Sequence, residues 1–129
     1  MANNSSKFDL EDRLVDFACM NLDVCDLLPN TKAGQNLNFQ LSKSCTATAL
    51  IYGEVQGAES MADFLHKMKL VLKEIKETRV CLKIIRKKPL VVHEKVEKAF
   101  TEATELMAIF LKSISTAKSN QSKLRKNNN

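Results

Sequence analysis

The chain has little of what most other fold classes need. Its 129 residues include no Trp, one Tyr, three Gly and two Pro. So few glycines and prolines leave too few turns for a many-stranded β fold, while abundant Leu, Ala, Lys and Glu favour helices. A chain of this length is expected to form one domain with a core of its own. The sequence therefore predicts a single all-α domain.

Long apolar runs and paired cysteines are also missing. No segment approaches the roughly 18 apolar residues of a membrane span, and the polar start of the chain is unlike a signal peptide. We therefore expect a cytoplasmic protein that does not bind membranes. The cysteines form no CxxC pair and lie on or beside apolar stripes, so we predict reduced, buried thiols rather than disulfides or metal ligands. These residues are Cys19, Cys25, Cys45 and Cys81.

Sequence motifs of catalysis are absent as well. The two histidines, His66 and His93, do not stand in an HExxH arrangement. The chain has no glycine-rich phosphate loop and no GxSxG nucleophile motif. The carboxylate and ExxH motifs of di-iron helix bundles are missing too. We therefore expect a protein that is not an enzyme and that uses no cofactor and no metal.

Apolar residues at helical spacing predict four helices. For the first helix, Ser6 is the expected N-cap with Asp9 three positions on, and Pro29 ends it. The second helix is expected over residues 36–53. Positive-φ backbone is expected at the two glycines that follow its last turn, because helices often end in that conformation. These glycines are Gly53 and Gly57.

The third and fourth helices have clearer signals. Ser60 and Asp63 form a capping pair for the third helix, and the fourth begins near His93 and fades after Ala117. Arg79 interrupts the apolar stripe of the third helix. Six apolar residues define that stripe: Met61, Leu65, Met68, Leu72, Ile75 and Leu82.

Four amphipathic helices with short connections favour an antiparallel up-down-up-down four-helix bundle. We place the bundle at residues 8–117. A flexible N-terminal tail is expected over residues 1–7, and a flexible basic tail is expected over residues 118–129.

Charge is distributed unevenly along the chain, whose net charge is +5. Residues 1–66 carry four basic and nine acidic side chains, whereas residues 67–88 carry nine basic and two acidic ones. Like charges three or four positions apart on a helix repel each other, so a basic third helix needs a compensating partner unless it is simply a solvated lysine-rich face.

Two kinds of partner fit this pattern. The first is RNA or DNA, held without sequence specificity because lysines and arginines replace counterions on phosphates. The second is protein: the acidic first helix of one subunit contacts the basic third helix of the next, head to tail, in an assembly or adaptor protein that binds no nucleic acid. The candidate nucleic-acid-binding residues are Lys73, Lys76, Lys83, Arg86, Lys87, Lys88, Lys123, Arg125 and Lys126.

Some residues of the second and third helices resemble a known family. Gln40 and Leu41 lead through small residues to Glu54, and Phe64, Leu65, Leu72 and Glu74 follow. This run resembles the bacterial 23S ribosomal RNA intervening-sequence family of four-helix-bundle proteins, over roughly residues 8 to 115. We expect Glu54 and Arg79 to pair and set the helix register. Structural polar roles are assigned to Gln40, Glu54, Glu74 and Arg79.

The chain departs from the family pattern at several positions, so it resembles a divergent member. Ser42 and Lys43 replace paired arginines, and Val55 replaces a glycine. The family is similar in fold to the accessory variability determinant of diversity-generating retroelements. That resemblance implies a homopentameric ring and a role on nucleic acid beside a reverse transcriptase.

Overall fold

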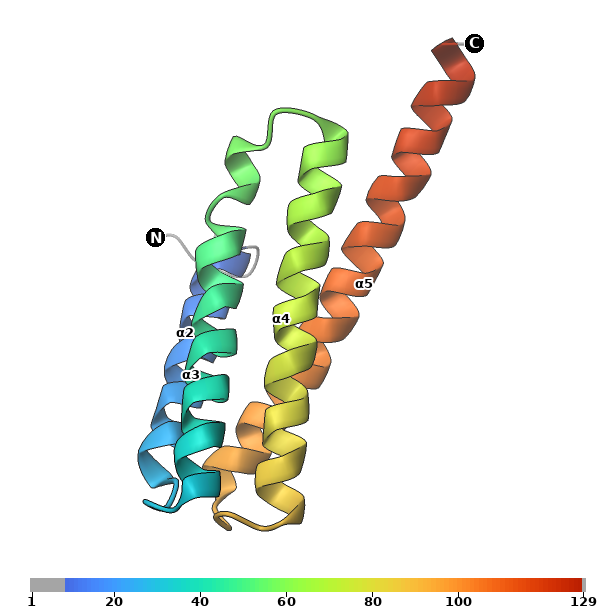
Figure 1. Cartoon of the computed structure of the whole chain (residues 1–129). Coiled ribbons are helices and arrows are strands. Elements are labelled where there is room, and N and C mark those ends of the chain that lie inside the picture. The colour runs from blue at the N-terminus through green and yellow to red at the C-terminus, as the bar shows by residue number, and fades with distance from the viewer. Residues whose placement is uncertain (1–8, 129) are drawn as a thin grey trace, which may run out of the picture.

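The computed structural model describes residues 9–128, most of which belong to four helices (Figure 1). Each helix runs in the opposite direction to the one before it, which confirms the predicted all-α antiparallel up-down-up-down four-helix bundle. A short 3-10 turn, η1, joins the second helix to the third. The elements are α2 (Leu10–Leu27), α3 (Lys32–Tyr52), η1 (Val55–Gly57), α4 (Met61–Lys87) and α5 (Glu94–Asn128).

The helices pack around a continuous apolar interior. α3 lies between α2 and α4, and α5 packs along α4 and more briefly along α2. α2 and α4 therefore occupy diagonal corners of the bundle. Phe17 and Phe110 are the largest fully buried side chains, and burying each stabilises the fold by roughly 1.5–3 kcal/mol. The predicted stripe of α4 is buried at Leu65, Met68, Leu72, Ile75 and Leu82.

The helix starts differ in part from expectation. The carboxylate of Asp9, which is the N-cap of α2, accepts a hydrogen bond from the Asp12 amide at 3.1 Å; Ser6 lies outside the described residues. The prediction that the next helix starts at residue 36 is wrong. α3 begins four residues earlier, at Lys32, because the hydroxyl of the N-cap Thr31 accepts a hydrogen bond from the Gly34 amide at 3.1 Å.

Gly34 has a packing role that the sequence did not reveal. The first turn of α3 lies so close to the preceding loop that a Cβ atom at this position would overlap with the carbonyl oxygen of Pro29. The proline that ends α2 and the glycine that starts α3 therefore fit together, and this contact makes the connection between the two helices short.

The turn after α3 was predicted incorrectly and the start of α4 correctly. No glycine has positive φ, and Gly53 is helical, with its amide donating to the Ala49 carbonyl at 2.9 Å. The backbone stays right-handed into η1, so no residue with positive φ is needed at this turn. The capping pair at the start of α4 is confirmed, because the Asp63 amide donates to the Ser60 hydroxyl at 3.0 Å and the Glu59 amide to the Asp63 carboxylate at 3.1 Å.

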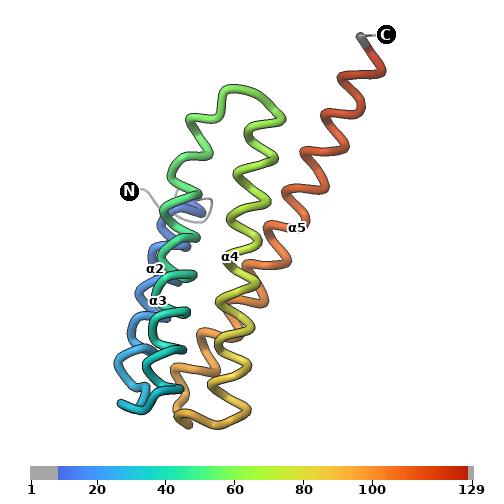
Figure 2. Tube along the Cα trace, viewed as in Figure 1, coloured from blue at the N-terminus to red at the C-terminus, as the bar shows by residue number. Residues whose placement is uncertain are grey.

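The last helix is longer than expected. α5 continues to Asn128, whereas the sequence placed its end near Ala117, which is the last residue described as buried. The tube view shows the end of α5 leaning away from the other helices and projecting beyond the bundle (Figure 2). No Gly or Pro follows Ala117, so nothing stops the helix where its core contacts end.

The three buried thiols behave as predicted and the fourth does not. Burial raises the pKa of Cys25 to about 11 and that of Cys45 to about 12, and it also raises the pKa of Cys81. These groups stay protonated at neutral pH. Cys19 is exposed on α2, contrary to the prediction, and all four thiols are free.

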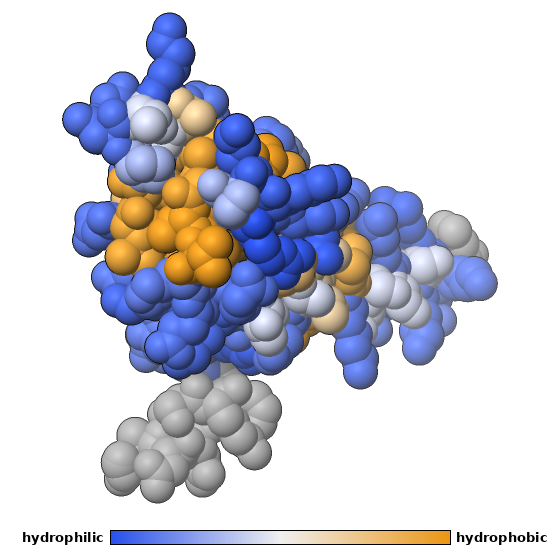
Figure 3. Space-filling view, turned by 90° about the horizontal axis from the view of Figure 1, so that it is seen from below, coloured by the Kyte–Doolittle hydropathy of each residue, from blue (hydrophilic) through white to orange (hydrophobic). Residues whose placement is uncertain are grey.

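The surface is polar apart from local apolar areas. Figure 3 looks onto the end of the bundle that holds the α2–α3 and α4–α5 connections, and apolar surface gathers in the middle of that end, bordered by polar side chains. Among residues 9–128, no helix combines the length and apolar character that crossing a membrane requires.

Candidate nucleic-acid interface

Five lysines form a line along the outside of α4, which we name the lysine stripe. Spacings of four, three, seven and four residues keep them on one side of the helix, and Val80 fills the gap in the line. All five are exposed. At the rise of an α-helix, the stripe is about 27 Å long. Its members are Lys69, Lys73, Lys76, Lys83 and Lys87.

The stripe is hardly neutralised by the fold. Its one ion pair within residues 9–128 joins Lys73 Nζ to Glu77 Oε1 at 4.0 Å, and both side chains are exposed. Such a pair contributes at most about 1 kcal/mol. Lys67 lies off the stripe and is bonded to Asp63 at 2.9 Å, a contact that lowers the pKa of the carboxyl and raises that of the ammonium group.

The two arginines of α4 point to α5 instead. Arg79 Nε donates to the Thr104 hydroxyl at 3.0 Å, and its guanidinium lies 4.7 Å from the centre of the Phe100 ring. Arg86 lies over the same ring at 4.0 Å and donates to Glu97 Oε1 at 3.0 Å. We call this group the arginine seam. Arg86, a predicted nucleic-acid contact, is therefore engaged within the chain.

The remaining predicted contacts are spread over the molecule. Lys88 caps the end of α4, beside the connection to α5. Lys123, Arg125 and Lys126 lie on the projecting end of α5, at the other end of the molecule. About 44 Å of helix separates the start of α5 from Lys123. The structure therefore brings together the lysines of α4 but does not join them to the basic tail.

The expected pair of Glu54 and Arg79 is not formed. Glu54 is exposed in the turn before α4, whereas Arg79 lies about 27 Å along that helix and is bonded to Thr104. Gln40 is exposed on α3. Glu74 is half-buried, and burial followed by the nearby Glu77 raises the pKa of its carboxyl.

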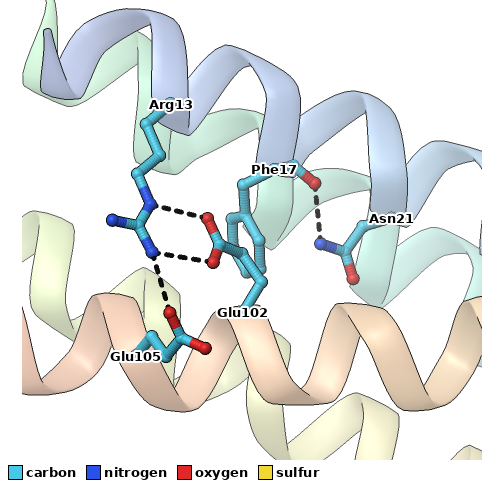
Figure 4. Close-up of polar contacts among 5 residues, drawn as sticks. All are labelled: Arg13, Phe17, Asn21, Glu102 and Glu105. Carbon is cyan, nitrogen blue, oxygen red and sulfur yellow. Dashed lines mark hydrogen bonds and ion pairs between the residues drawn. The ribbon is translucent and has the colours of Figure 1, made fainter. Parts of the chain in front are cut away.

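An ion-pair cluster between α2 and α5 was not predicted from the sequence (Figure 4). Arg13 binds both carboxylate oxygens of Glu102, at 2.8 and 2.9 Å, and Glu105 at 3.2 Å. The hydrogen bond to Glu102 is the main reason that the pKa of Arg13 is raised. Arg13 is the only basic residue of α2, which was the one available signal.

Asn21, the polar residue on the core face of α2, is fully buried beside this cluster (Figure 4). Its amide nitrogen donates to the Phe17 carbonyl at 2.8 Å. Its Oδ1 atom has no hydrogen-bond partner in residues 9–128.

A shallow groove of about 910 Å³ runs along the outside of α4 to the first turns of α3. Val80 and Ile84 line it and are 52% and 47% exposed, so apolar side chains lie directly beside the ammonium groups of the stripe. The other lining residues are Asn36, Leu37, Gln40, Lys69, Leu72, Lys73, Lys76, Glu77 and Cys81.

The outer face of α2 has the opposite charge. We name it the acidic face; it carries only carboxylates as charged groups, and none of them forms an ion pair within residues 9–128. Val15 and Leu22 lie on the same side and are 45% and 37% exposed. The carboxylates belong to Glu11, Asp12, Asp16, Asp23 and Asp26.

Metal binding has no support in the described part of the chain, where no three His, Cys, Asp or Glu side chains gather in a way that could hold an ion. The candidate binding features are therefore on the surface. They are the lysine stripe, the apolar groove beside it, and the acidic face of α2 on the diagonal corner of the bundle.

Comparison with known proteins finds similarity among solved structures. No family model matches the chain, and no curated protein matches it. Among solved structures, it is similar to a protein of unknown function from the S23 ribosomal protein family of Bacteroides thetaiotaomicron, at 25% sequence identity and a TM-score of 0.73. The match covers 81% of this chain and 96% of that one. The match confirms the predicted resemblance, because the S23 ribosomal protein family is the same family as the 23S ribosomal RNA intervening-sequence proteins. The chain shares the fold of that family.

Proposed function

We propose that the protein is a non-enzymatic bundle that binds RNA or DNA without sequence specificity through the lysine stripe of α4. The observation that carries this proposal is the line of five exposed lysines, four of which have no ion-pair partner within residues 9–128. Each ammonium group placed near a phosphate releases a condensed counterion, and that release favours binding whatever the base sequence.

The lack of exposed aromatic rings on the lysine stripe favours contacts to the phosphates of a nucleic acid over contacts to its bases. Phe39 is the one strongly exposed aromatic residue in the described part of the chain, and it lies on α3, where Lys43 approaches its ring at 6.0 Å. The ring of Phe100 is occupied by two guanidinium groups. With no exposed ring on the stripe, stacking of bases contributes little, and phosphates are the groups that the lysines bind.

The test is RNA binding by fluorescence anisotropy at low salt with a charge-reversal variant. We expect Lys73→Glu, Lys76→Glu and Lys83→Glu together to abolish binding, because three attractive contacts become repulsive. The matched control is Lys32→Glu, Lys95→Glu and Lys98→Glu, which reverses three exposed lysines elsewhere with the same change in net charge and should change binding little. Absence of binding by the wild type at low salt, or binding unchanged at about 0.2 M salt, would contradict the proposal.

The same reversal variant tests the assembly hypothesis. Loss of an oligomer in light scattering, with no nucleic acid bound by the wild type, would show that the stripe serves subunit contacts alone. The homopentameric ring and the reverse transcriptase partner stay predictions from the resemblance.

A further inference from the structure

We infer that the outer side of α3 carries a stacking site for an unpaired base, so that the protein prefers a duplex that ends in a few unpaired nucleotides. The site consists of the exposed ring of Phe39 and the hollow beside it. This inference rests on the proposed function, in which the lysine stripe holds the phosphates of a duplex, and it adds the kind of nucleic acid that is held.

Phe39 is an aromatic residue in an unusual position. Its side chain is 61% exposed, whereas every other aromatic side chain in residues 9–128 is buried or half-buried. An aromatic ring stabilises a fold chiefly through the large area that it buries, so this ring contributes little to the bundle. Exposed aromatic rings are, by contrast, the surfaces on which proteins stack the bases of single strands.

A hollow of about 370 Å³ lies beside this ring, between the α2–α3 connection and the first turns of α3. We name it the Phe39 hollow. Its volume is at the small end of the range for ligand sites, which suits a single base rather than a larger ligand. Apolar side chains and amides are among the groups that line it, and they belong to Leu28, Pro29, Asn30, Gln35 and Asn38.

The amides of the hollow are held in place and keep free hydrogen-bonding groups. Gln35 Nε2 donates to Asn30 Oδ1 at 2.6 Å, and Asn38 Nδ2 donates to the Cys25 carbonyl at 3.0 Å. Each of these bonds uses one N–H of a primary amide and leaves a second N–H for a ligand. The edge of any stacked base carries donors or acceptors for such groups, so the site accepts bases without strict selection.

The ring lies close to the path of a strand that leaves the lysine stripe. The hydrogen bond of 2.9 Å between Ser44 and Thr78 fixes how the antiparallel helices α3 and α4 lie side by side. Phe39 is five residues before Ser44, and Lys83 is five residues after Thr78, so the two are level along the bundle. Because neighbouring helix axes are about 8–10 Å apart, the strand crosses only one helix to reach the ring.

Lys43 supplies a positive charge beside the ring. Its Nζ atom lies 6.0 Å from the centre of the Phe39 ring, at the outer limit of a cation–π contact. The side chain is exposed and forms no ion pair within residues 9–128. A stacked base therefore has an ammonium group available for its phosphate, and this combination of charge and aromatic ring is typical of sites for single strands.

Pairing decides which nucleotides can use the site. Inside a duplex, each base is stacked between its neighbours and its faces are not accessible to a protein ring, whereas the unpaired bases at an end can be splayed out. The Phe39 hollow should therefore contribute nothing to a blunt duplex, and stacking of one base should raise the affinity for an overhang about tenfold.

The experiment compares three DNA probes by fluorescence anisotropy at low salt. The first is a blunt duplex of about 8 base pairs, which matches the length of the stripe. The second carries three unpaired adenines at one end, and the third carries three abasic nucleotides there, so the last two have the same phosphates and differ only in the rings. We expect the wild type to bind the adenine probe about tenfold more tightly than the abasic probe.

Three variants assign this difference to the ring. Phe39→Ala should bind the adenine and abasic probes equally and the blunt duplex like the wild type, and Phe39→Trp should keep the preference. The matched control is Leu50→Ala, because Leu50 is 70% exposed on the same outer side of α3, three turns away from the hollow. This control should keep the about tenfold preference for adenines.

Salt dependence separates stacking from charge. The affinity for all three probes should fall as salt rises, but the ratio between the adenine and abasic probes should stay about tenfold, because the two probes release the same counterions. Equal affinity of the wild type for these two probes, a preference that survives in Phe39→Ala, or a preference that Leu50→Ala also loses overturns the inference. If the blunt duplex binds in any of these cases, the proposed function stands. If none of the probes binds, the proposed function and this inference are both wrong.

Discussion

Arginine and lysine occupy different sides of the same helix in this protein. On the side of α4 that meets α5, Arg79 and Arg86 lie over the ring of Phe100 and are hydrogen-bonded to α5. On the outer side, the lysine stripe has a single weak ion pair to the described part of the chain. Both sides are basic in the sequence, but only one is neutralised within the fold.

The difference follows from the chemistry of the two side chains. A guanidinium group is planar and stacks on aromatic rings while its N–H groups donate to fixed acceptors. An ammonium group is a compact, strongly hydrated charge on a flexible stem, and it keeps its water until a ligand offers enough negative charge. The arginine seam therefore belongs to the structure of the bundle, and the stripe is available to a partner.

The largest effect expected from this contrast is on salt dependence. With five phosphate contacts, the logarithm of the affinity for a DNA duplex should fall with the logarithm of the salt concentration at a slope of about −4.5. The affinity should therefore fall about 500-fold between 0.05 and 0.2 M salt. Lys76→Gln with Lys83→Gln should reduce the slope to about −2.7 and the loss to about 40-fold. Binding titrations at several salt concentrations measure this slope.

Lys95→Gln with Lys98→Gln is the control for this measurement, because both lysines lie at the start of α5, away from the stripe. An equal loss of slope in this control would mean that nucleic acid is held by the overall charge and not by the outer side of α4.

A second pair of variants compares how much the inner and outer sides of α4 contribute to the free energy of unfolding. Ile85 is fully buried, and its neighbour Ile84 is 47% exposed in the groove. Ile85→Ala should lower the free energy of unfolding by about 2–5 kcal/mol through lost burial and a cavity, whereas Ile84→Ala should change it by about 0.5 kcal/mol or less. Urea denaturation measures both. Equal losses would show that the groove is part of the core.

The sequence was sufficient to predict the helices because each has apolar residues at helical spacing. Five of the six residues in the apolar stripe of α4 are buried as predicted, and the sixth, Met61, is exposed at the first turn. The capping pair of Ser60 and Asp63 was predicted correctly. The start of α3 was missed because Gly34 interrupts the helical pattern, although it fits against Pro29. The last turns of α5 were missed because they contact no core, so no apolar periodicity marks them.

The site was predictable only as a charged segment. The excess of lysine and arginine over residues 67–88 identified α4, but the seven-residue step from Arg79 to Arg86 gives no sign that both side chains reach Phe100. The same is true of Arg13, whose partners lie about ninety residues further along the chain. Which charges a fold neutralises depends on side chains from other helices, and the order of residues along one helix does not contain that information.

Neighbouring residues at the end of α4 test the contrast on a smaller scale. Arg86→Gln removes the ion pair to Glu97 and the stacking on Phe100, so it should cost about 1 kcal/mol of stability. Lys87→Gln should cost about 0.5 kcal/mol or less and should instead lower the salt slope of duplex binding by about 0.9. Thermal unfolding and binding titrations distinguish the two. A larger loss of slope for Arg86→Gln would contradict the division of roles.

The smallest effect is expected from removing residues 118–129, which carry four of the basic side chains. No described side chain after Ala117 is buried, so the free energy of unfolding should change by about 0.5 kcal/mol or less. The effect on binding should depend on duplex length. A DNA duplex of about 8 base pairs, at 3.4 Å per pair, covers the 27 Å stripe and should bind equally well with or without the tail.

A duplex of about 20 base pairs extends past the stripe toward the projecting end of α5, so its affinity should fall when the tail is removed. Isothermal titration of both duplexes with both proteins measures the difference. If the short duplex already loses affinity, the tail bends back to the stripe and the two basic regions act as one surface. If neither duplex responds, Lys123, Arg125 and Lys126 take no part in binding, and the lysines of α4 account for all of it.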